Sequence, residues 1–220
     1  MSAAPAIRPD VDQASQPVPS EVLLRDIPLP VTIQPAAPLG DDALLAFCAA
    51  NSGLEIESDA DGSIRIMTPA GPESSHLNQL LSGELMVWAR RNGKGIVFGP
   101  DLGVRFPDKI LRAPDAAWLS MERWDSLKQR RKLPSFLPIC PEFVAELRSR
   151  TDRASAVEAK MEFWMSRGAE LGWLIDPRRK QVMIYRPGRE PETLLRPEFL
   201  EADGPIQGFR LDMAEFWKDG

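Results

Sequence analysis

The chain has 220 residues, of which 43% are apolar, so it can bury one substantial core and carry an additional unstructured segment. Its 27 Lys and Arg residues against 32 Asp and Glu residues give a net charge of −5, which argues against a protein that coats nucleic acid through bulk positive charge. No apolar run approaches the ~20 residues of a membrane helix, and the N-terminus lacks the basic-then-apolar layout of a signal peptide. We therefore expect a cytoplasmic protein that does not enter a membrane.

Residues 1–38 are rich in Pro, Ala and Ser and show little periodicity, as in PVPS at 17–20 and IPLPV at 27–31. This composition predicts a flexible N-terminal arm. Residues 39–220 then form one domain, and a chain that starts near Gly40 should still fold.

The domain is predicted to begin with a helix and a β-hairpin. An aspartate pair can cap a helix over 41–53, and two alternating segments at 54–58 and 63–67 flank a DADG turn. Leucines and a tryptophan at helical spacing then predict a long amphipathic helix over 73–92.

The remaining elements alternate between strands and helices. The patterns predict strands at 95–99, 103–106, 113–119, 142–149, 172–176 and 181–186, and helices at 120–127, 153–167 and 212–217. The first two of these strands are expected to pair with each other. An α/β (α+β) fold with a mixed central sheet and helices on both sides accounts for this order.

Two carboxylates in apolar strand-like segments are the best indication of chemistry. Asp115 lies in APDAAWL (113–119) and Glu146 in EFVAELRS (142–149), and Lys160 follows on the apolar side of the next helix. An ionised carboxylate is costly to bury without a partner, so these acids indicate a metal ion or another cation. Metal-assisted phosphodiester cleavage is the leading hypothesis.

Other kinds of site have less support. Cys48 and Cys140 are far apart and belong to no CxxC pair, so neither a zinc site nor a disulfide framework is indicated. His76 is the single histidine, which argues against a histidine-rich metal site or a Ser/His/Asp triad. Basic clusters occur at 128–132, 148–153 and 178–180, and the second of them adjoins Glu146.

From residue 51 to 217 the chain resembles the Uma family of putative restriction endonucleases, within the PD-(D/E)XK nuclease superfamily. The segments that carry the resemblance are NSGLEIESDADGSIRIM (51–67), PAGPESSHLNQLL (69–81), GVRFPDKILRAPDAAWLSMERWDSL (103–127), PICPEFVAELRSRTD (138–152), KMEFWMSRGAELGWLIDP (160–177), QVMIYRPG (181–188) and GFRLDMAEFW (208–217). The resemblance implies a restriction endonuclease-like fold and a metal-dependent endonuclease that hydrolyses DNA phosphodiester bonds.

Carried over by position, the superfamily's metal-binding acids correspond to Asp115, the Asp of a Pro-Asp pair, and Glu146. A glutamate typical of the family corresponds to Glu57, which is expected as an additional metal acid. Mg²⁺, or Mn²⁺ in its place, takes one or two carboxylates together with waters and phosphate oxygens. By alternation alone, Glu57 would occupy an ordinary solvent-exposed strand face.

The chain departs from the superfamily pattern two residues after Glu146, where Arg148 replaces the expected lysine. An arginine can clamp a phosphate but cannot take a proton from water. Lys160 is the candidate replacement for positioning or deprotonating water, and the alternative is a lysine that extends its ammonium to solvent.

Two other functions stay open from the sequence. One is a catalytically weak or inactive module of the same fold that binds nucleic acid or a protein partner, which Arg148 and the acidic net charge favour. The other is hydrolysis of a small phosphorylated substrate by the same acids. Nucleases of this type often act as dimers, and a homodimer is one arrangement that allows both DNA strands to be cut.

Overall fold

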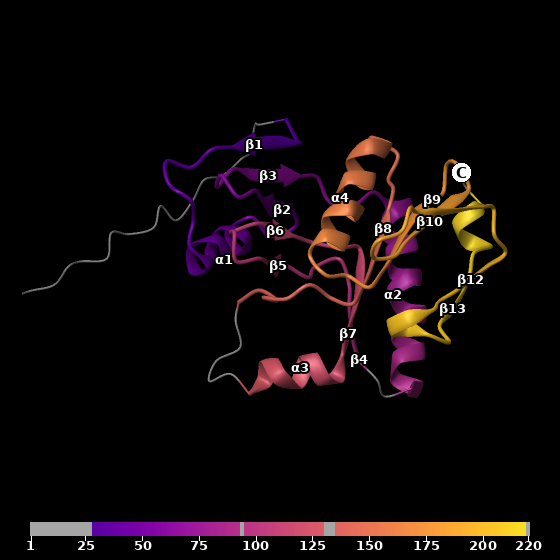
Figure 1. The fold of residues 1–220 in the computed structure, drawn as a ribbon. Helices are drawn as coiled ribbons and strands as arrows, with labels where there is room; N and C mark the ends of the chain where they lie inside the picture. The colour runs from indigo at the N-terminus through magenta and orange to yellow at the C-terminus, as the bar shows by residue number, and fades with distance from the viewer. Residues whose placement is uncertain (1–27, 93–94, 130–134, 219–220) are drawn as a thin grey trace, which may run out of the picture.

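The computed structural model describes residues 28–92, 95–129 and 135–218, which form two main sheets and their covering helices (Figure 1). The elements in chain order are β1 (Val31–Ile33), α1 (Asp41–Ala50), β2 (Glu55–Ser58), β3 (Ile64–Met67), α2 (Pro72–Asn92), β4 (Gly95–Phe98), β5 (Val104–Arg105), β6 (Leu111–Arg112), β7 (Ala116–Ser120), α3 (Met121–Lys128), β8 (Phe143–Leu147), α4 (Ala154–Ser166), β9 (Leu171–Asp176), β10 (Gln181–Tyr185), β11 (Glu192–Leu195), β12 (Phe199–Glu201), η1 (Gly204–Ile206), β13 (Arg210–Asp212) and η2 (Glu215–Trp217).

The larger sheet has six strands in the order β11-β10-β9-β8-β7-β4. Its central pair, β8 and β9, is parallel, and α4 makes the crossover that a parallel pair requires. One face packs against buried residues of α2, and the other packs against α4. The expected mixed α/β fold, with helices on both faces of a central sheet, is therefore confirmed.

Both central strands are buried at each of their residues, because helices cover the two faces of the sheet. Gly172 in β9 allows α4 to pack closely, since a Cβ at this position would collide with the end of the Met161 side chain. This close packing holds the residue before Met161, Lys160, over the sheet.

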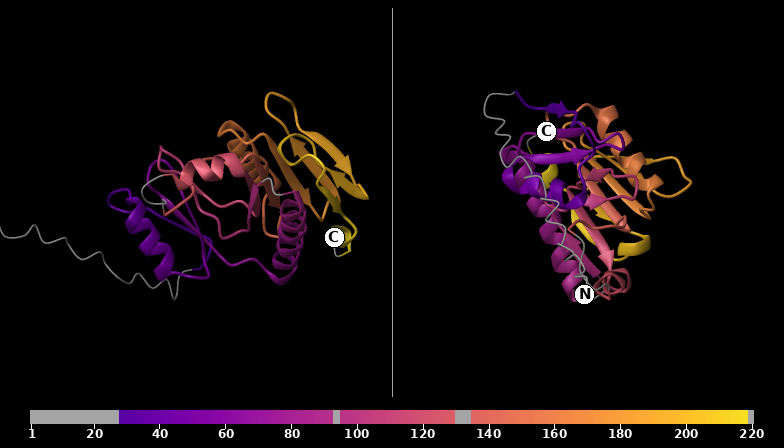
Figure 2. Two further views of the ribbon diagram at one scale, coloured as in Figure 1. Left: turned by 90° about the horizontal axis from the view of Figure 1, so that it is seen from below. Right: turned by 90° about the vertical axis from the view of Figure 1, so that its left-hand side faces the viewer.

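The smaller sheet has the order β1-β3-β2-β6-β5 and packs its apolar face against α1. This unit lies at one end of the molecule and the C-terminal strands lie at the other (Figure 2). Val31–Ile33 were expected within the flexible arm, but they form the edge strand β1, paired with β3. The alternating apolar and polar residues of β1 directly follow Pro-rich sequence, so this strand was not predicted from the sequence. The rest of the predicted arm, residues 1–27, lies outside the described residues.

Two expectations about local structure were wrong. The strands near 95 and 104 do not pair with each other, because β4 pairs with β7 and β5 pairs with β6. The helix expected over 212–217 is only the 3₁₀ turn η2, since β13 occupies residues 210–212 and pairs with β12.

Four tryptophans contribute to the core. Trp118, Trp164, Trp173 and Trp217 are all less than 10% exposed. The C-terminal residues from β12 to η2 complete the core on the α2 side of the larger sheet. Among the described helices, none has the length and apolar character to span a membrane.

Candidate active site

Glu146 lies on the face of the central sheet that α4 covers. Alternate residues of β8 join the core beneath α2, so the strand turns Val144 and Glu146 toward α4. The Glu146 side chain is almost fully buried, and Trp164 of α4 donates a hydrogen bond from Nε1 to its Oε1 at 2.7 Å.

Lys160 lies one helical turn before Trp164 and points into the same region. Its Nζ is 3.0 Å from Glu146 Oε2 and 3.2 Å from Glu57 Oε1, and it donates to the Ala113 carbonyl oxygen at 2.7 Å. A lysine ammonium has three N–H donors, and three acceptors surround this one. The predicted position of Lys160 beside Glu146 is confirmed, and its ammonium does not extend to solvent.

Asp115 directly precedes β7, and the antiparallel register of β7 with β8 brings it beside Glu146. Its two oxygens are both held by hydrogen bonds. The Leu147 amide donates to Oδ2 at 2.6 Å, and Asn78 Nδ2 of α2 donates to Oδ1 at 3.1 Å. The two acids predicted from the sequence are therefore presented from adjacent strands.

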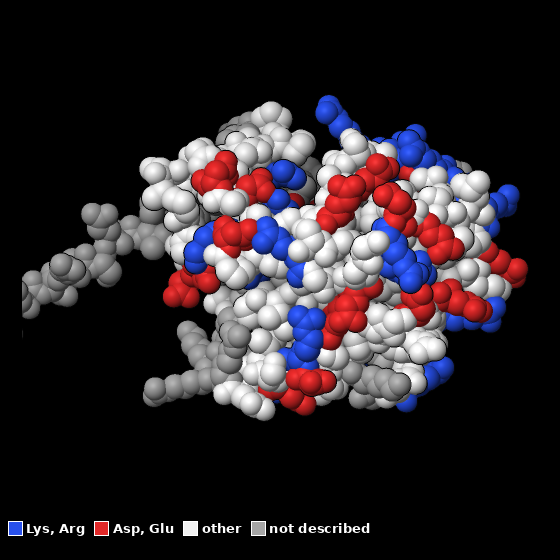
Figure 3. All heavy atoms as spheres, viewed as in Figure 1, with Lys and Arg blue, Asp and Glu red and all other residues white. Residues whose placement is uncertain are grey.

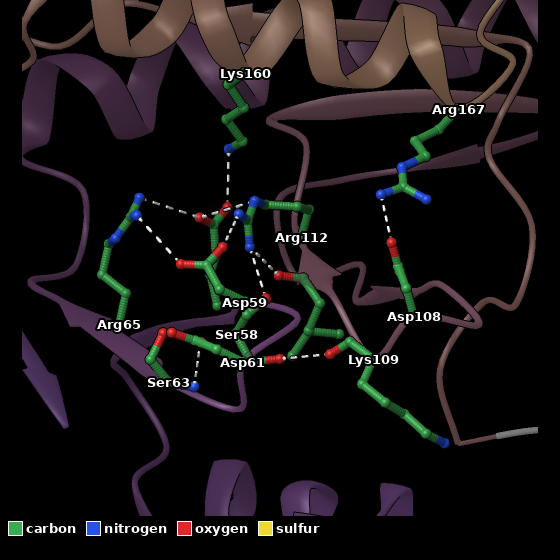
Figure 4. A network of polar contacts seen from close by, with 12 residues as sticks. Ser58, Asp59, Asp61, Ser63, Arg65, Asp108, Lys109, Arg112, Lys160 and Arg167 are labelled. Atoms are coloured by element: carbon green, nitrogen blue, oxygen red, sulfur yellow. Dashed lines mark hydrogen bonds and ion pairs between the residues drawn. The ribbon is translucent and has the colours of Figure 1, made fainter. Parts of the chain in front are cut away.

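Glu57 joins this group from the smaller sheet. It was expected on a solvent-exposed strand face, but α4 covers it and leaves it 4% exposed. Figure 4 shows Lys160 reaching down from its helix toward β2, where Arg65 and Arg112 approach from the strands. These two arginines lie 3.9 and 3.7 Å from Glu57 Oε2.

Burial and the neighbouring charges shift the pKa values of the acids and of Lys160. Burial raises the pKa of Asp115, although Lys160 and the Leu147 amide oppose the shift. Burial also raises the pKa of Glu146 to about 8, with Lys160 opposing the shift and Asp115 adding to it. Burial alone would lower the pKa of Lys160, but Glu146, Glu57 and Asp115 raise it above its ordinary value. Lys160 therefore keeps its proton at neutral pH.

A protein-family model matches residues 41–214, which is most of the chain, and that family is Uma2, described as putative restriction endonuclease. The chain belongs to this family. No curated protein matches the chain. The family assignment made from the quoted sequence segments is thus confirmed.

A solved structure from Anabaena variabilis, described as a putative nuclease belonging to DUF820, is similar to this Uma2 chain. The TM-score is 0.63 and the sequence identity is 19%, and the match covers 74% of this chain and 89% of that one. At this identity the likeness establishes the shared nuclease-type fold alone.

Arg148, the departure from the superfamily pattern, lies at the edge of the site. Its Nη1 donates to Asp176 Oδ2 at 2.6 Å, and its other nitrogens donate to the Asp152 carbonyl oxygen. Within the described residues it makes no hydrogen bond or ion pair with the candidate metal acids. Its predicted role in steadying phosphate stays a prediction, and its contacts give it a structural role at the end of β9.

Two basic clusters of the sequence meet beside Arg148. A small depression at the carboxyl ends of β8 and β9 is lined by Arg148 and Arg150 from one cluster and by Arg178 from another. Arg150 is tied to the start of α2 through Glu73, at 2.7 Å. Asp176 accepts a hydrogen bond from the Arg179 amide at 3.1 Å, which stabilises the turn after β9.

Several residues that contact the acids have no role assigned from the sequence. Trp164 lies at an apolar-periodic position typical of the core, and its indole N–H holds Glu146. Asn78 of the long helix reaches Asp115. Arg112 had no assigned role and lies beside Glu57. The buried position of Asn78 on an otherwise apolar helix stripe was the available signal.

The resemblance to nucleases implies a metal ion, and the three acids are its candidate ligands. Asp115, Glu146 and Glu57 offer only carboxylate oxygens, which suit Mg²⁺ and Mn²⁺. Glu57 Oε1 is buried without a hydrogen bond, since Lys160 Nζ is near it but outside hydrogen-bonding geometry. No group of three or more acidic, His or Cys side chains is arranged to enclose a metal among the described residues. The donor set therefore fits Mg²⁺ bound by one or two carboxylates and completed by water and substrate.

Proposed function

We propose that this protein is a metal-dependent endonuclease that hydrolyses DNA phosphodiester bonds. The observation that carries the proposal is the convergence of Glu57 and Glu146 on Lys160, beside Asp115. The buried Glu57 and Glu146 and the partly buried Asp115 bring carboxylate oxygens together at one place, and carboxylate oxygens are the ligands by which a divalent ion next to a phosphate is bound. Membership in the Uma2 family supports the same reaction class.

Asp115 and Glu146 would hold the metal, with Glu57 as the additional acid. When bound, Mg²⁺ or Mn²⁺ polarises the phosphate and lowers the pKa of an attacking water. Trp164 and the Leu147 amide fix one oxygen each of Glu146 and Asp115, which orients the carboxylates before substrate arrives.

Lys160 would act as a charged hydrogen-bond donor. Because its pKa is raised, its ammonium is not a base at neutral pH, so we assign it the positioning role of the two expected from the sequence. Its Nζ would hold water or a phosphate oxygen with the N–H nearest Glu57 Oε1, because that oxygen accepts no hydrogen bond from it. Arg148 is retained as a peripheral phosphate contact.

Plasmid nicking tests the proposal. Supercoiled DNA and single-stranded DNA are incubated with Mg²⁺ or Mn²⁺ and wild type, Asp115→Asn or Glu146→Gln. Glu142→Gln is the matched control, because Glu142 is a buried carboxylate at the other end of β8, bonded to Ser120. Metal-dependent cleavage that is lost in the two site variants and kept in the control is the expected result. Cleavage that persists in Glu146→Gln would refute the assignment.

A non-catalytic module that binds nucleic acid or a protein partner is the second candidate. One observation favours it, since the donors of Lys160 are all directed at protein acceptors and Arg148 is engaged with Asp176. DNA binding by wild type without cleavage under any metal condition would select this candidate. A homodimer remains a proposal, and light scattering of the purified protein tests it.

A further inference from the structure

Arg65 is the feature of the site that has no assigned role. It lies on β3 directly opposite Glu57 in the strand register, and 46% of its side chain is exposed. Its nitrogens lie 3.9 Å from Glu57 Oε2 and 3.7 Å from Asp59 Oδ2. These contacts are ion pairs without hydrogen-bonding geometry, so the five N–H donors of the guanidinium have no hydrogen bond within the described part of the chain.

The other arginine beside Glu57, Arg112, has its donors committed. Arg112 donates to the Ser58 carbonyl at 2.8 Å and the Leu111 carbonyl at 3.0 Å, pairs with Asp59, and packs over the Phe163 ring. Lys160 is surrounded by acceptors. Figure 4 shows this contrast, with Arg112 enclosed by its partners and Arg65 at the outer edge of the network.

Arg65 and the depression lined by Arg148, Arg150 and Arg178 are cationic features beside the site. Figure 3 shows Lys and Arg side chains interspersed with Asp and Glu on the face that it draws, without one large positive patch. In a protein with a net charge of −5, a polyanion needs specific cationic contacts to approach a group of buried acids. Arg65 and Lys160 contact opposite oxygens of the same Glu57 carboxylate, so a phosphate held by Arg65 lies beside the candidate active site.

We infer that Arg65 is a phosphate-binding residue that anchors the nucleic-acid backbone next to the cleavage site, exchanging its long contacts with Glu57 and Asp59 for hydrogen bonds to phosphate oxygens. A guanidinium forms paired hydrogen bonds with phosphate, which are shorter and stronger than these ion pairs. The inference rests on the proposed function, because it names a substrate contact of that same site.

The test is binding of a short fluorescein-labelled DNA duplex, followed by anisotropy across a range of NaCl concentrations, with Ca²⁺ and again with EDTA. The proteins are wild type, Arg65→Ala, Arg65→Lys and the control Arg189→Ala. Arg189 is an exposed arginine in the turn after β10. The last residue of β10 pairs with a residue near the start of β9, so this turn lies at the opposite end of the sheet from Glu146. Melting temperatures are measured for all four proteins.

Arg65→Ala should bind several-fold more weakly than wild type at low salt, and the slope of log K against log salt should shrink by about 0.9. Arg65→Lys should restore the slope because it retains the charge, and Arg189→Ala should match wild type. Equal binding by Arg65→Ala and wild type would overturn this inference and leave the proposed function intact. Equal loss in the Ala and Lys variants with lowered melting temperatures would also overturn it, because the effect would then come from altered folding, whereas equal loss at unchanged melting temperatures would support a contact made by the paired hydrogen bonds of the guanidinium. Absence of DNA binding by wild type would refute the inference, while plasmid nicking separately decides the proposed activity.

Discussion

Removing the Lys160 ammonium should have the largest effect of any single change at the candidate site. Lys160→Met keeps a stem of similar length and deletes the charge between Glu146 and Glu57. Both carboxylates are less than 5% exposed, so Glu146 would be left buried without the cation that contacts it, while Glu57 would keep its longer contacts with Arg65 and Arg112. Breaking a buried pair by removing one partner typically costs about 3–5 kcal/mol. We expect Lys160→Met to lower the free energy of unfolding by about 3 kcal/mol.

Urea unfolding at pH 9, above the pKa of about 8 of Glu146, followed by tryptophan fluorescence and circular dichroism, measures this loss. The double variant Lys160→Met/Glu146→Gln should be more stable than Lys160→Met alone, because the second change neutralises the stranded carboxylate. Mg²⁺ should also raise the melting temperature of Lys160→Met, since a cation can take the vacated position. A loss below about 1 kcal/mol, or strictly additive effects in the double variant, would refute the charge balance that we describe.

Three further predictions follow from the same geometry. Because burial raises the pKa of Glu146 from 4.5 to about 8, the folded chain holds a proton that the unfolded chain releases across this range. The contribution of Glu146 to stability therefore falls as pH rises from 4.5 to 8. The free energy of unfolding of Glu146→Gln, measured in urea, should rise relative to that of wild type as the pH increases. A difference between the two proteins that does not change with pH would contradict the raised pKa. Trp164→Phe removes the hydrogen bond to Glu146 and should cost about 2 kcal/mol, and less in the Glu146→Gln background. A chain that begins at Gly40 lacks β1 and should unfold at a lower urea concentration than the full chain, whereas an equal midpoint would show that the edge strand is dispensable.

The sequence predicted the larger sheet and its two acids because their signals are local. Glu146 is a charged residue inside the apolar segment FVAEL, and the helix pattern that follows places Lys160 on the buried side. A parallel strand pair with a helical crossover then leaves few arrangements for these residues. The positions of Asp115, Glu146 and Lys160 could therefore be anticipated without the structure.

The environment of Glu57 could not be predicted, because its burial depends on a helix about 100 residues further along the chain. Alternation along β2 describes only the strand, and α4 changes which face is exposed. The pairing of β4 with β7 was not predicted for a related reason, since two adjacent strand-like segments give no indication that each will join a different sheet. The hydrogen bond from Arg148 to Asp176 could not be predicted either, because it depends on where β9 ends beside β8.

The short passage between β6 and β7 carries a consequence for the wider family. Within three residues the chain leaves the smaller sheet at Arg112, offers the Ala113 carbonyl to Lys160, and positions Asp115 at the start of the larger sheet. One inserted residue here would rotate Asp115 away from the Leu147 amide, whereas the turn at 186–191 can lengthen without disturbing the acids. We therefore expect relatives that retain the site to keep the interval from Arg112 to Asp115, and a changed interval to accompany loss of the site.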